Sequence, residues 1–538
     1  MKLLWLLLGL HALSNSSTPK QPNIVFIVAD DMGYQDVGFR GSNIRTPNID
    51  RLAREGVILE NHYVMSVCAP TRASLMTGRY PIRTGFWKGN LNSVEKFGLG
   101  LNEILLPEML KRNGYITHGV GKWHCGAYSW DHTPAKRGFH TFFGLFQGAQ
   151  DYYSHRHQDW LDFREDYYDA HGHFVDDIRD DLDDRYNTYL FTNRSVELIR
   201  NHDKTRPLFL YLAYTAPHGP DQASVEDMET FTSDLNQNYT RRYATMVSIM
   251  DEGIGMVANK LKEQGMMNNT ILVFTSDNGA RFSSHGSNYP LRGGKGTVLE
   301  GGVRGVTFVN SPLLQKTGYT NTNLHHVTDW YATFQKLTND NPEKHDKTQL
   351  PIDGVDIWGS IDSNTSCREE VLLNLRVPSK YLNNPCEECL GLSSLQSQEG
   401  NHLNSPNFNH SNSQDHDFFA LRWQKWKLLA GRTFQLQGWS SENKAEGYLN
   451  FTDSQGDSQQ RSVGSGTLLF DLSSDEREEH NVAEQYPDIV TYLLRKRQGY
   501  LDNMISVEHR KFANITMEDG VFRPWVTDLM NDTTEYYS

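Results

Sequence analysis

The sequence predicts an α/β fold with a large, mixed but mostly parallel sheet flanked by helices, and a smaller C-terminal α+β domain carrying an antiparallel sheet. Three observations support this prediction. Short apolar segments have the composition of strands buried on both faces of a sheet. Segments with apolar residues at helical spacing lie between them. Beyond residue 417, strand-like segments are followed by one helical segment. The chain has 538 residues, of which 38% are hydrophobic, enough for a large core.

Buried parallel strands are expected at four places. Asn23–Asp30 (NIVFIVAD) is the clearest, because an unbroken apolar run leads directly into acidic residues. Leu208–Thr215 and Thr270–Asp277 have the same character, and Gly302–Asn310 is a further candidate. Strands that alternate with helices in this way indicate a sheet covered on both faces.

Helices are expected between these strands. Thr46–Gly56 begins with a threonine suited to the N-cap and a proline suited to the first turn. Arg241–Gly265 is longer, and its methionines, isoleucines and valine at helical spacing indicate a face packed against the core. Ser66–Tyr80 (SVCAPTRASLMTGRY) turns helical after its cysteine, and Gly78 is expected to end that helix.

Composition divides the chain into four parts. Residues 1–16 resemble a signal peptide, and residues 20–378 contain the strands and helices of the large N-terminal domain. Residues 379–417 are rich in Asn, Ser and Gln, which indicates a long loop or a domain boundary. Residues 418–538 form the expected C-terminal α+β subdomain. Its strands are predicted in FFALRWQKWKLLAG and TLLFDLSSD, and its helix in PDIVTYLLRKRQGYLDNM.

The first residues predict entry into the secretory pathway. MKLLWLLLGLHALSNSS combines one lysine, a short apolar run and small residues suited to cleavage. The run is shorter than the roughly 20 residues of a membrane-spanning helix, so we expect no membrane span. A lysosomal or extracellular protein is predicted, and the net charge of −14 leaves no expectation of a nucleic-acid partner. Possible glycosylation sites agree with this route: Asn193, Asn238, Asn268, Asn364, Asn409, Asn450, Asn514 and Asn531.

The cysteine count is odd. The five residues are Cys68, Cys125, Cys367, Cys386 and Cys389. Setting Cys68 aside leaves four, which could form two disulfides in an oxidising compartment. The Cys386-x-x-Cys389 spacing also occurs in redox and zinc motifs, but a structural bridge, or a pairing with Cys367, is favoured because no second such motif supports the zinc alternative.

Oxygen donors follow two of the predicted strands. Asp30 and Asp31 come after the first strand, and Asp277 and Asn278 come after a later one. Ligands in open α/β sheets bind at the carboxyl ends of the strands, so we expect these side chains to meet. Such oxygens suit Ca²⁺ or Mg²⁺ better than zinc. The alternative, two ordinary polar turns, explains each pair alone but not their recurrence in one sheet.

Cationic and imidazole side chains follow the same pattern. They are Arg72, Lys122, His124, His218 and Lys295. Each alone could be a surface lysine or a histidine of the core. Together with a divalent metal they would form a pocket for a tetrahedral oxyanion, and a helix that begins near Cys68 would favour the same charge.

The segment from Cys68 to Arg72 (CAPTR), followed by a Leu-x-Thr-Gly-Arg pattern, resembles the signature of the type I sulfatases, in the alkaline phosphatase superfamily. The resemblance extends over most of the chain and is strongest to the arylsulfatase B group. Segments that carry it include VGKWHCG, DYYSH, YPLRGGKGTVLEGGVRGV and QKWKLLAG. It implies an alkaline phosphatase-like fold and the hydrolysis of sulfate esters.

The resemblance also implies a cofactor and a modification. The formylglycine-generating enzyme would convert Cys68 to Cα-formylglycine (3-oxoalanine), whose hydrate attacks sulfur. One Ca²⁺ per subunit would be bound by Asp30, Asp31, Asp277, Asn278 and the modified Cys68. Arg72 would orient the hydrate, and Lys122, Lys295 and His218 would hold the sulfate. His218 would protonate the leaving oxygen, and His124 would take the proton that allows sulfate to be expelled.

Two substrate classes stay open. One is the N-acetylgalactosamine-4-sulfate end of a glycosaminoglycan, and the other is a small aryl, steroid or glucosinolate sulfate ester. The acidic run Asp162–Tyr186 is interpreted as a solvated loop, and its position at the pocket mouth would count against a polyanionic substrate. The sequence Lys295–Leu299 departs from arylsulfatase B, so the pocket wall is expected to differ.

Two other functions are disfavoured. A two-zinc phosphatase or phosphodiesterase of the same superfamily would need a Ser or Thr nucleophile and a cluster of histidine ligands. A catalytically silent binding protein would have lost Cys68, Arg72 or one of the acids, and all of these are present.

Overall fold

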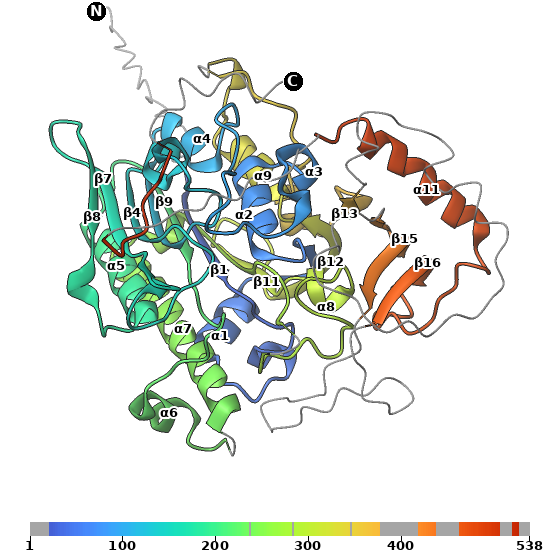
Figure 1. Ribbon diagram of the computed structural model, residues 1–538, viewed down its shortest axis with the longest axis horizontal. Coiled ribbons are helices and arrows are strands. Elements are labelled where there is room, and N and C mark those ends of the chain that lie inside the picture. Colours follow the sequence, from blue (N-terminus) through green and yellow to red (C-terminus); the bar gives the residue numbers. More distant parts are fainter. Residues whose placement is uncertain are drawn as a thin grey trace, which may run out of the picture.

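The computed structural model describes residues 21–235, 238–281, 284–344, 347–376, 418–436, 462–505 and 519–526. A ten-stranded mixed sheet with helices on both faces forms the larger part, and a four-stranded antiparallel sheet lies to its side (Figure 1). Both parts of the predicted fold class are confirmed. The predicted signal peptide, the segment 379–417 and the Cys386–Cys389 motif lie outside the described residues.

Five parallel strands form the centre of the large sheet. Their order is β10 (Thr270–Ser276), β1 (Asn23–Ala29), β9 (Leu208–Ala213), β3 (Ile116–Lys122) and β4 (Thr141–Leu145). Every residue of β1 is buried, as expected for a strand covered on both faces. Because these strands run in one direction, the residues that follow them meet at one edge of the sheet.

The flanking strands are mixed in direction. The full order is β12 (Tyr319–His326), β2 (Val57–Tyr63), β11 (Thr307–Asn310), β10, β1, β9, β3, β4, β7 (Arg164–Tyr168) and β8 (Phe174–Ile178). The expectation of a parallel strand at Gly302–Asn310 is wrong. Strand β11 starts later and pairs antiparallel with β10, because the preceding residues form the short helix α8 (Glu300–Val303).

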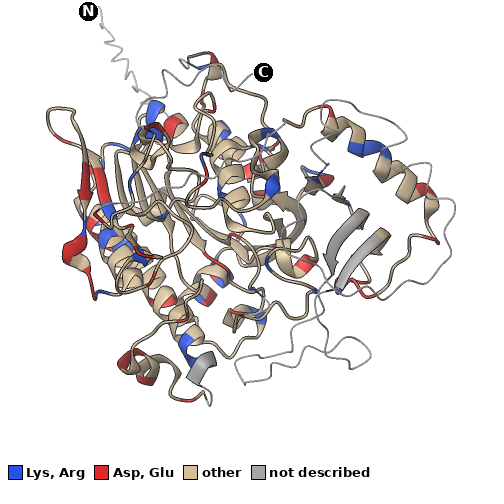
Figure 2. Cartoon of the chain, in the orientation of Figure 1, with Lys and Arg blue, Asp and Glu red and all other residues tan. Residues whose placement is uncertain are grey.

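The acidic run is not a solvated loop. It contains β7 and β8, which form an antiparallel hairpin at the edge of the large sheet (Figure 2). Asp162 and Asp166 of this run are fully buried. Aromatic residues in both strands and β-branched residues in β8 favour pairing in a sheet, which the charge of the segment had obscured.

Two layers of helices cover the large sheet. Helices α1, α5 and α7 pack with Val25 and Ile27 of β1 on one face, and α2, α4 and α9 pack with Ile24 and Phe26 on the other. The helices are α1 (Pro47–Glu55), α2 (Cys68–Thr77), α3 (Pro81–Thr84), α4 (Leu106–Arg112), α5 (Asn187–Asn201), α6 (Val225–Thr232), α7 (Asn238–Glu263), α9 (Asp329–Leu337) and α10 (Trp358–Ser363). Within the described residues, none of the helices has the length and apolar character to span a bilayer.

The small sheet comprises β13 (Glu370–Arg376), β14 (Phe418–Trp423), β15 (Trp426–Leu436) and β16 (Ser462–Asp471), followed by α11 (Pro487–Leu501). Strand β13 precedes the predicted boundary at residue 378, yet it belongs to this sheet. A two-stranded ribbon, β5 (Arg156–His157) with β6 (Trp160–Leu161), completes the strands described. Cys125 is buried, Cys367 is exposed, and the two are not bonded to each other.

Candidate active site

The oxygen donors predicted from the strand ends do meet. Asp30 and Asp31 follow β1, and Asp277 and Asn278 follow its neighbour β10. The Asp31 backbone N–H donates to Asp277 Oδ1 at 3.2 Å, and Asn278 Nδ2 donates to Asp31 Oδ1 at 2.8 Å. All four side chains are at most 4% exposed. Asp31 has a φ of 61°, and this left-handed backbone conformation turns the chain sharply out of the strand.

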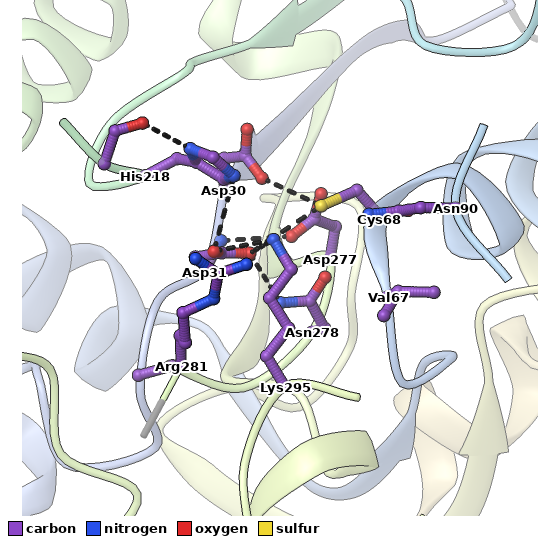
Figure 3. Close-up of polar contacts among 12 residues, drawn as sticks. Asp30, Asp31, Val67, Cys68, Asn90, His218, Asp277, Asn278, Arg281 and Lys295 are labelled. Atoms are coloured by element: carbon purple, nitrogen blue, oxygen red, sulfur yellow. Dashed lines mark hydrogen bonds and ion pairs between the residues drawn. The ribbon is translucent and has the colours of Figure 1, made fainter. Parts of the chain in front are cut away.

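Cys68 is the first residue of α2 and faces these acids (Figure 3). Its Sγ lies 3.3 Å from Asp30 Oδ1 and 3.7 Å from Asp31 Oδ1. Burial, together with the charges of Asp277 and Asp30, raises the pKa of the Cys68 thiol well above its usual value. A thiolate is therefore strongly disfavoured here, and an unmodified Cys68 would be a poor nucleophile.

Three cations are paired with the acids. Lys122 Nζ lies 2.6 Å from Asp30 Oδ2, and Lys295 Nζ lies 2.6 and 2.7 Å from the two oxygens of Asp31. Arg72 donates through Nε at 3.1 Å and Nη2 at 2.8 Å to Asp277 Oδ2. These contacts link β3, the glycine-rich segment after β10, and α2 to one cluster.

The three acids of this cluster differ in how readily they ionise. Burial opposes ionisation of Asp30 and Asp31, but the surrounding cations, chiefly Lys122 for the first and Lys295 for the second, hold their pKa values below the ordinary value. Burial and the charge of Asp30 raise the pKa of Asp277 to about 6, although Arg72 opposes the shift. Three carboxyl groups at this density require positive charge close by.

The two predicted histidines differ in their contacts. His124 Nε2 lies 3.0 Å from the Leu91 carbonyl oxygen, which can only accept, so Nε2 carries the proton. Its Nδ1 is buried and has no partner in the part of the chain described. Burial, with Lys122 nearby, lowers the pKa of His124 well below the usual value. The ring is therefore neutral, with Nδ1 available as a base.

His218 approaches the cluster beside Asp31. Its Nδ1 donates to the Gly219 carbonyl oxygen at 2.6 Å, and its Nε2 lies 3.6 Å from Asp31 Oδ2. Burial lowers the pKa of His218, although Asp31 and Asp30 oppose the shift. Tyr152 fixes the same loop, because its hydroxyl group lies 2.7 Å from the His218 carbonyl oxygen.

The acidic residues fit a hard divalent cation. Ligand atoms of Asp30, Asp31, Cys68 and His218 all lie within 4.8 Å of one another. Asn278 Oδ1 is buried and has no partner among the described residues, although its Nδ2 is fully used. Carboxylate and amide oxygens gathered in this way are the donor set that Ca²⁺ prefers.

Sequence reasoning missed three supporting residues. Asn90 Oδ1 accepts from the Ala69 backbone N–H at 3.1 Å, at the start of the helix that carries Cys68. Gly148 lies so close to the His124 ring that a Cβ atom there would be 2.6 Å from it. Tyr152 lies in the segment DYYSH, but no role was predicted for its side chain. None of the three is charged or lies at a strand end, so no local signal marked them.

Comparisons with known proteins agree with this geometry. A family model described as "Sulfatase" matches residues 22–340. The chain is 37% identical to arylsulfatase J of Mus musculus over 94% of this chain and 80% of that protein. It is 34% identical to the N-acetylgalactosamine-6-sulfatase of Mus musculus over 66% of this chain and 69% of that protein. The crystal structure of Ps i-CgsB in complex with k-i-k-neocarrahexaose is similar, with a TM-score of 0.69, 28% identity and coverage of 90% and 94% of the two chains.

Proposed function

Because the chain belongs to the sulfatase family and is a sulfuric ester hydrolase, we propose that it uses a formylglycine made from Cys68 and one bound Ca²⁺ to cleave sulfate from a sugar of a sulfated polysaccharide. The observation that carries the proposal is the position of Cys68. It begins a helix within 3.7 Å of two strand-end acids, and these acids are paired with two lysines and lie close to Arg72 and His218.

The properties of the thiol support the modification. Residue 68 is fully buried, and the raised pKa of its thiol leaves it protonated and unreactive at neutral pH. A formylglycine at this position would supply a hydrated aldehyde, which has one oxygen for attack on sulfur and a second whose deprotonation releases sulfate.

Asp30, Asp31, Asp277, Asn278 and residue 68 would hold the Ca²⁺. The metal would supply Lewis acidity and a fixed charge that compensates the three carboxylates. Arg72, held by two hydrogen bonds to Asp277, would then orient residue 68 from the side of α2.

The remaining residues bind sulfate and move protons. Lys122 and Lys295 would each donate to a sulfate oxygen. His218 presents Nε2 toward the cluster because Nδ1 is engaged by Gly219, so Nε2 would deliver a proton to the leaving oxygen. His124 has its proton on Nε2, and its free Nδ1 would accept a proton from residue 68.

Two similar proteins, an N-acetylgalactosamine-6-sulfatase and Ps i-CgsB in complex with k-i-k-neocarrahexaose, support a sulfated sugar as the substrate. The acidic run lies partly at each end of the sheet. Strand β7 is the fourth strand from β1 in the sheet order, about 20 Å away at the usual strand spacing. Tyr167 of β7 pairs with Thr141, the first residue of β4, so the turn between β7 and β8 lies toward the amino end of the central strands. The site lies at their carboxyl end. The hairpin turn therefore lies away from the site, whereas the acids at 180–184, which follow β8, begin at the end of the sheet that carries the site.

Gln150 offers a group that could recognise a sugar. Its side chain is 3% exposed, and neither carboxamide atom has a partner among the described residues. It lies in the chain between Gly148, which packs on the His124 ring, and Tyr152, which binds the His218 loop. We expect Gln150→Leu to raise KM about tenfold for a sugar sulfate, the effect of one lost hydrogen bond in a polar site, and to leave aryl sulfate kinetics unchanged.

The proposal is tested by producing the chain together with a formylglycine-generating enzyme. Mass spectrometry of the peptide that contains residue 68 is expected to show the aldehyde. kcat/KM is then compared on N-acetylgalactosamine 4-sulfate, its 6-sulfate, and aryl, steroid and glucosinolate sulfates, with Cys68→Ala as the blank. Preference for either sugar sulfate is expected. Turnover of only the small esters would overturn the substrate class, and an active enzyme with intact Cys68 would overturn the modification.

The cellular route follows from the same proposal. Formylglycine formation takes place in the endoplasmic reticulum, so the chain would follow the secretory pathway to the lysosome or the outside of the cell. Within the described residues, the sequon asparagines Asn193 and Asn364 lie at exposed positions that a glycan could reach.

A further inference from the structure

The segment Arg292–Gly301, here called the lysine loop, carries Lys295 into the active site. The loop is closed at its base by a hydrogen bond from the Gly301 N–H to the Arg292 carbonyl oxygen at 2.7 Å. Near its tip, the Gly296 N–H donates to the Ser66 carbonyl oxygen at 2.7 Å, just before Cys68. The position of Lys295 therefore depends on how the base of this loop is held.

The small sheet and the segment after it hold that base. Glu478, which follows β16, accepts through its backbone oxygen from Arg292 Nη1 at 2.8 Å and through Oε2 from the Glu300 N–H at 2.7 Å. Lys427 of β15 lies between two carboxylates, with Nζ 2.8 Å from Glu300 Oε1 and 2.8 Å from Glu478 Oε1. The Tyr63 hydroxyl donates to Glu300 Oε2 at 2.7 Å.

These contacts are fully shielded from water. Lys427, Glu300 and Glu478 are each 0% exposed. Val298 and Leu299 of the lysine loop pack in the same apolar cluster as Phe418 and Leu429 of the small sheet. A buried lysine between two carboxylates contributes little net stability but strongly fixes geometry, because any movement breaks pairs that water cannot replace.

We propose that Lys427 is a positioning residue for the sulfatase reaction. Through Glu300 and Glu478, it fixes the base of the lysine loop and thereby the Lys295 ammonium group that binds the substrate's sulfate. The small C-terminal sheet thus contributes to sulfate binding without touching the substrate. The inference rests on the proposed role of Lys295.

The test is a double-mutant cycle. Lys427→Met and Lys295→Ala are made singly and together, and kcat/KM on a sulfate ester and the inhibition constant of inorganic sulfate are measured. Lys427→Met is expected to lower kcat/KM about 10- to 100-fold, the effect of a small displacement of a binding group, and to weaken sulfate inhibition. In the Lys295→Ala background, Lys427→Met is expected to change kcat/KM less than about threefold, because both changes act through one contact.

Lys425→Met is the matched control. Lys425 lies two residues away, in the turn between β14 and β15, is 49% exposed and binds Asp471 at 2.6 Å. Its replacement is expected to leave both constants unchanged. Equal effects of Lys427→Met with and without Lys295 would overturn the proposal. Should Lys427→Met fail to fold, Lys427→Arg, which keeps the charge but changes its geometry, is carried through the same cycle with the same outcomes.

Full activity of Lys295→Ala alone is a separate outcome. It would overturn the assigned role of Lys295 and, with it, the positioning role of Lys427. A strong effect of Lys295→Ala, with an additive effect of Lys427→Met, would leave the proposed function intact and remove only the positioning role.

Discussion

Two buried clusters of charge lie on either side of the lysine loop, and they differ in how completely their polar atoms are paired. The first, here called the clamp cluster, is formed by Lys427, Glu300 and Glu478. Three of its four carboxylate oxygens accept a hydrogen bond, and the fourth, Glu478 Oε1, lies 2.8 Å from Lys427 Nζ as an ion pair. In the site cluster, Asn278 Oδ1 and His124 Nδ1 have none among the described residues. Buried polar groups in folded proteins are nearly always paired. The clamp cluster is therefore expected to serve the fold, and the unpaired atoms of the site cluster are the ones that an ion or a substrate would contact under the proposed function.

This comparison predicts that the site cluster affects activity far more than folding. Lys122→Met is expected to lower kcat/KM about 10²- to 10³-fold, because the proposed function makes Lys122 a preorganised donor to sulfate. In the presence of Ca²⁺ the free energy of unfolding should change little, since Arg72 and the metal still compensate Asp30. Steady-state kinetics and urea unfolding of the same preparations measure both. A loss of stability as large as the loss of transition-state stabilisation would show that this cluster is structural too.

Substitutions in the clamp cluster are expected to affect the free energy of unfolding more than they affect activity. Glu300→Gln removes the charge that faces Lys427, Arg304 and Arg422, and these cations stay buried. Breaking such a network from one side costs about 3–5 kcal/mol, so urea unfolding should show a fall of that order. Burial opposes ionisation of Glu300, but Lys427 above all holds its pKa at about 2, so the charge is present throughout the neutral and acid range.

The stability loss caused by Asp471→Asn is the reference for the loss caused by Glu300→Gln. Asp471 binds the exposed Lys425, and loss of such a surface pair is expected to cost less than about 1 kcal/mol. Equal stability losses for Glu300→Gln and Asp471→Asn would show that the clamp cluster stabilises the fold no more than an exposed ion pair does.

The two clusters also differ in how far the sequence predicts them. Asp30, Asp31, Asp277 and Asn278 follow apolar runs directly, so the parallel sheet brings them together whatever the loops do. The signature around Cys68 predicts the modification, and the structure places Cys68 and Arg72 beside these acids. The site was therefore predictable because strand direction determines it.

The clamp was not predictable, because it depends on the packing of two sheets. Glu300 and Lys427 are 127 positions apart, and neither lies at the end of a parallel strand. The antiparallel direction of β11 was missed for a related reason. Its apolar residues suit either direction, and the turn through Glu300–Val303 that reverses the chain has no periodic pattern.

A third buried acid, Asp166, lies in the acidic hairpin. Neither of its carboxylate oxygens has a hydrogen-bond partner among the described residues. Asp166 is 0% exposed and pairs across the strands with Asp176. Burial, with the charge of Asp176 adding to it, raises the pKa of Asp166 to about 8, although Arg164 opposes the shift.

Asp166→Asn is expected to show the smallest effect of the series, and one that depends on pH. The folded protein holds the Asp166 proton more tightly than the unfolded chain, whose pKa is near 3.8. The stability that this proton contributes is fully present below the unfolded value and is lost as the pH rises through about 8. The neutral asparagine removes this loss, so its Tm should exceed that of the wild type by several degrees at pH 8.5 and by much less at pH 5, which is close to the unfolded pKa. Asp177→Asn, on the exposed side of β8, is the control and should show no such difference. A gain in Tm that is equal at both pH values would mean that Asp166 stays ionised, and that the hairpin carries its charge as the site cluster does.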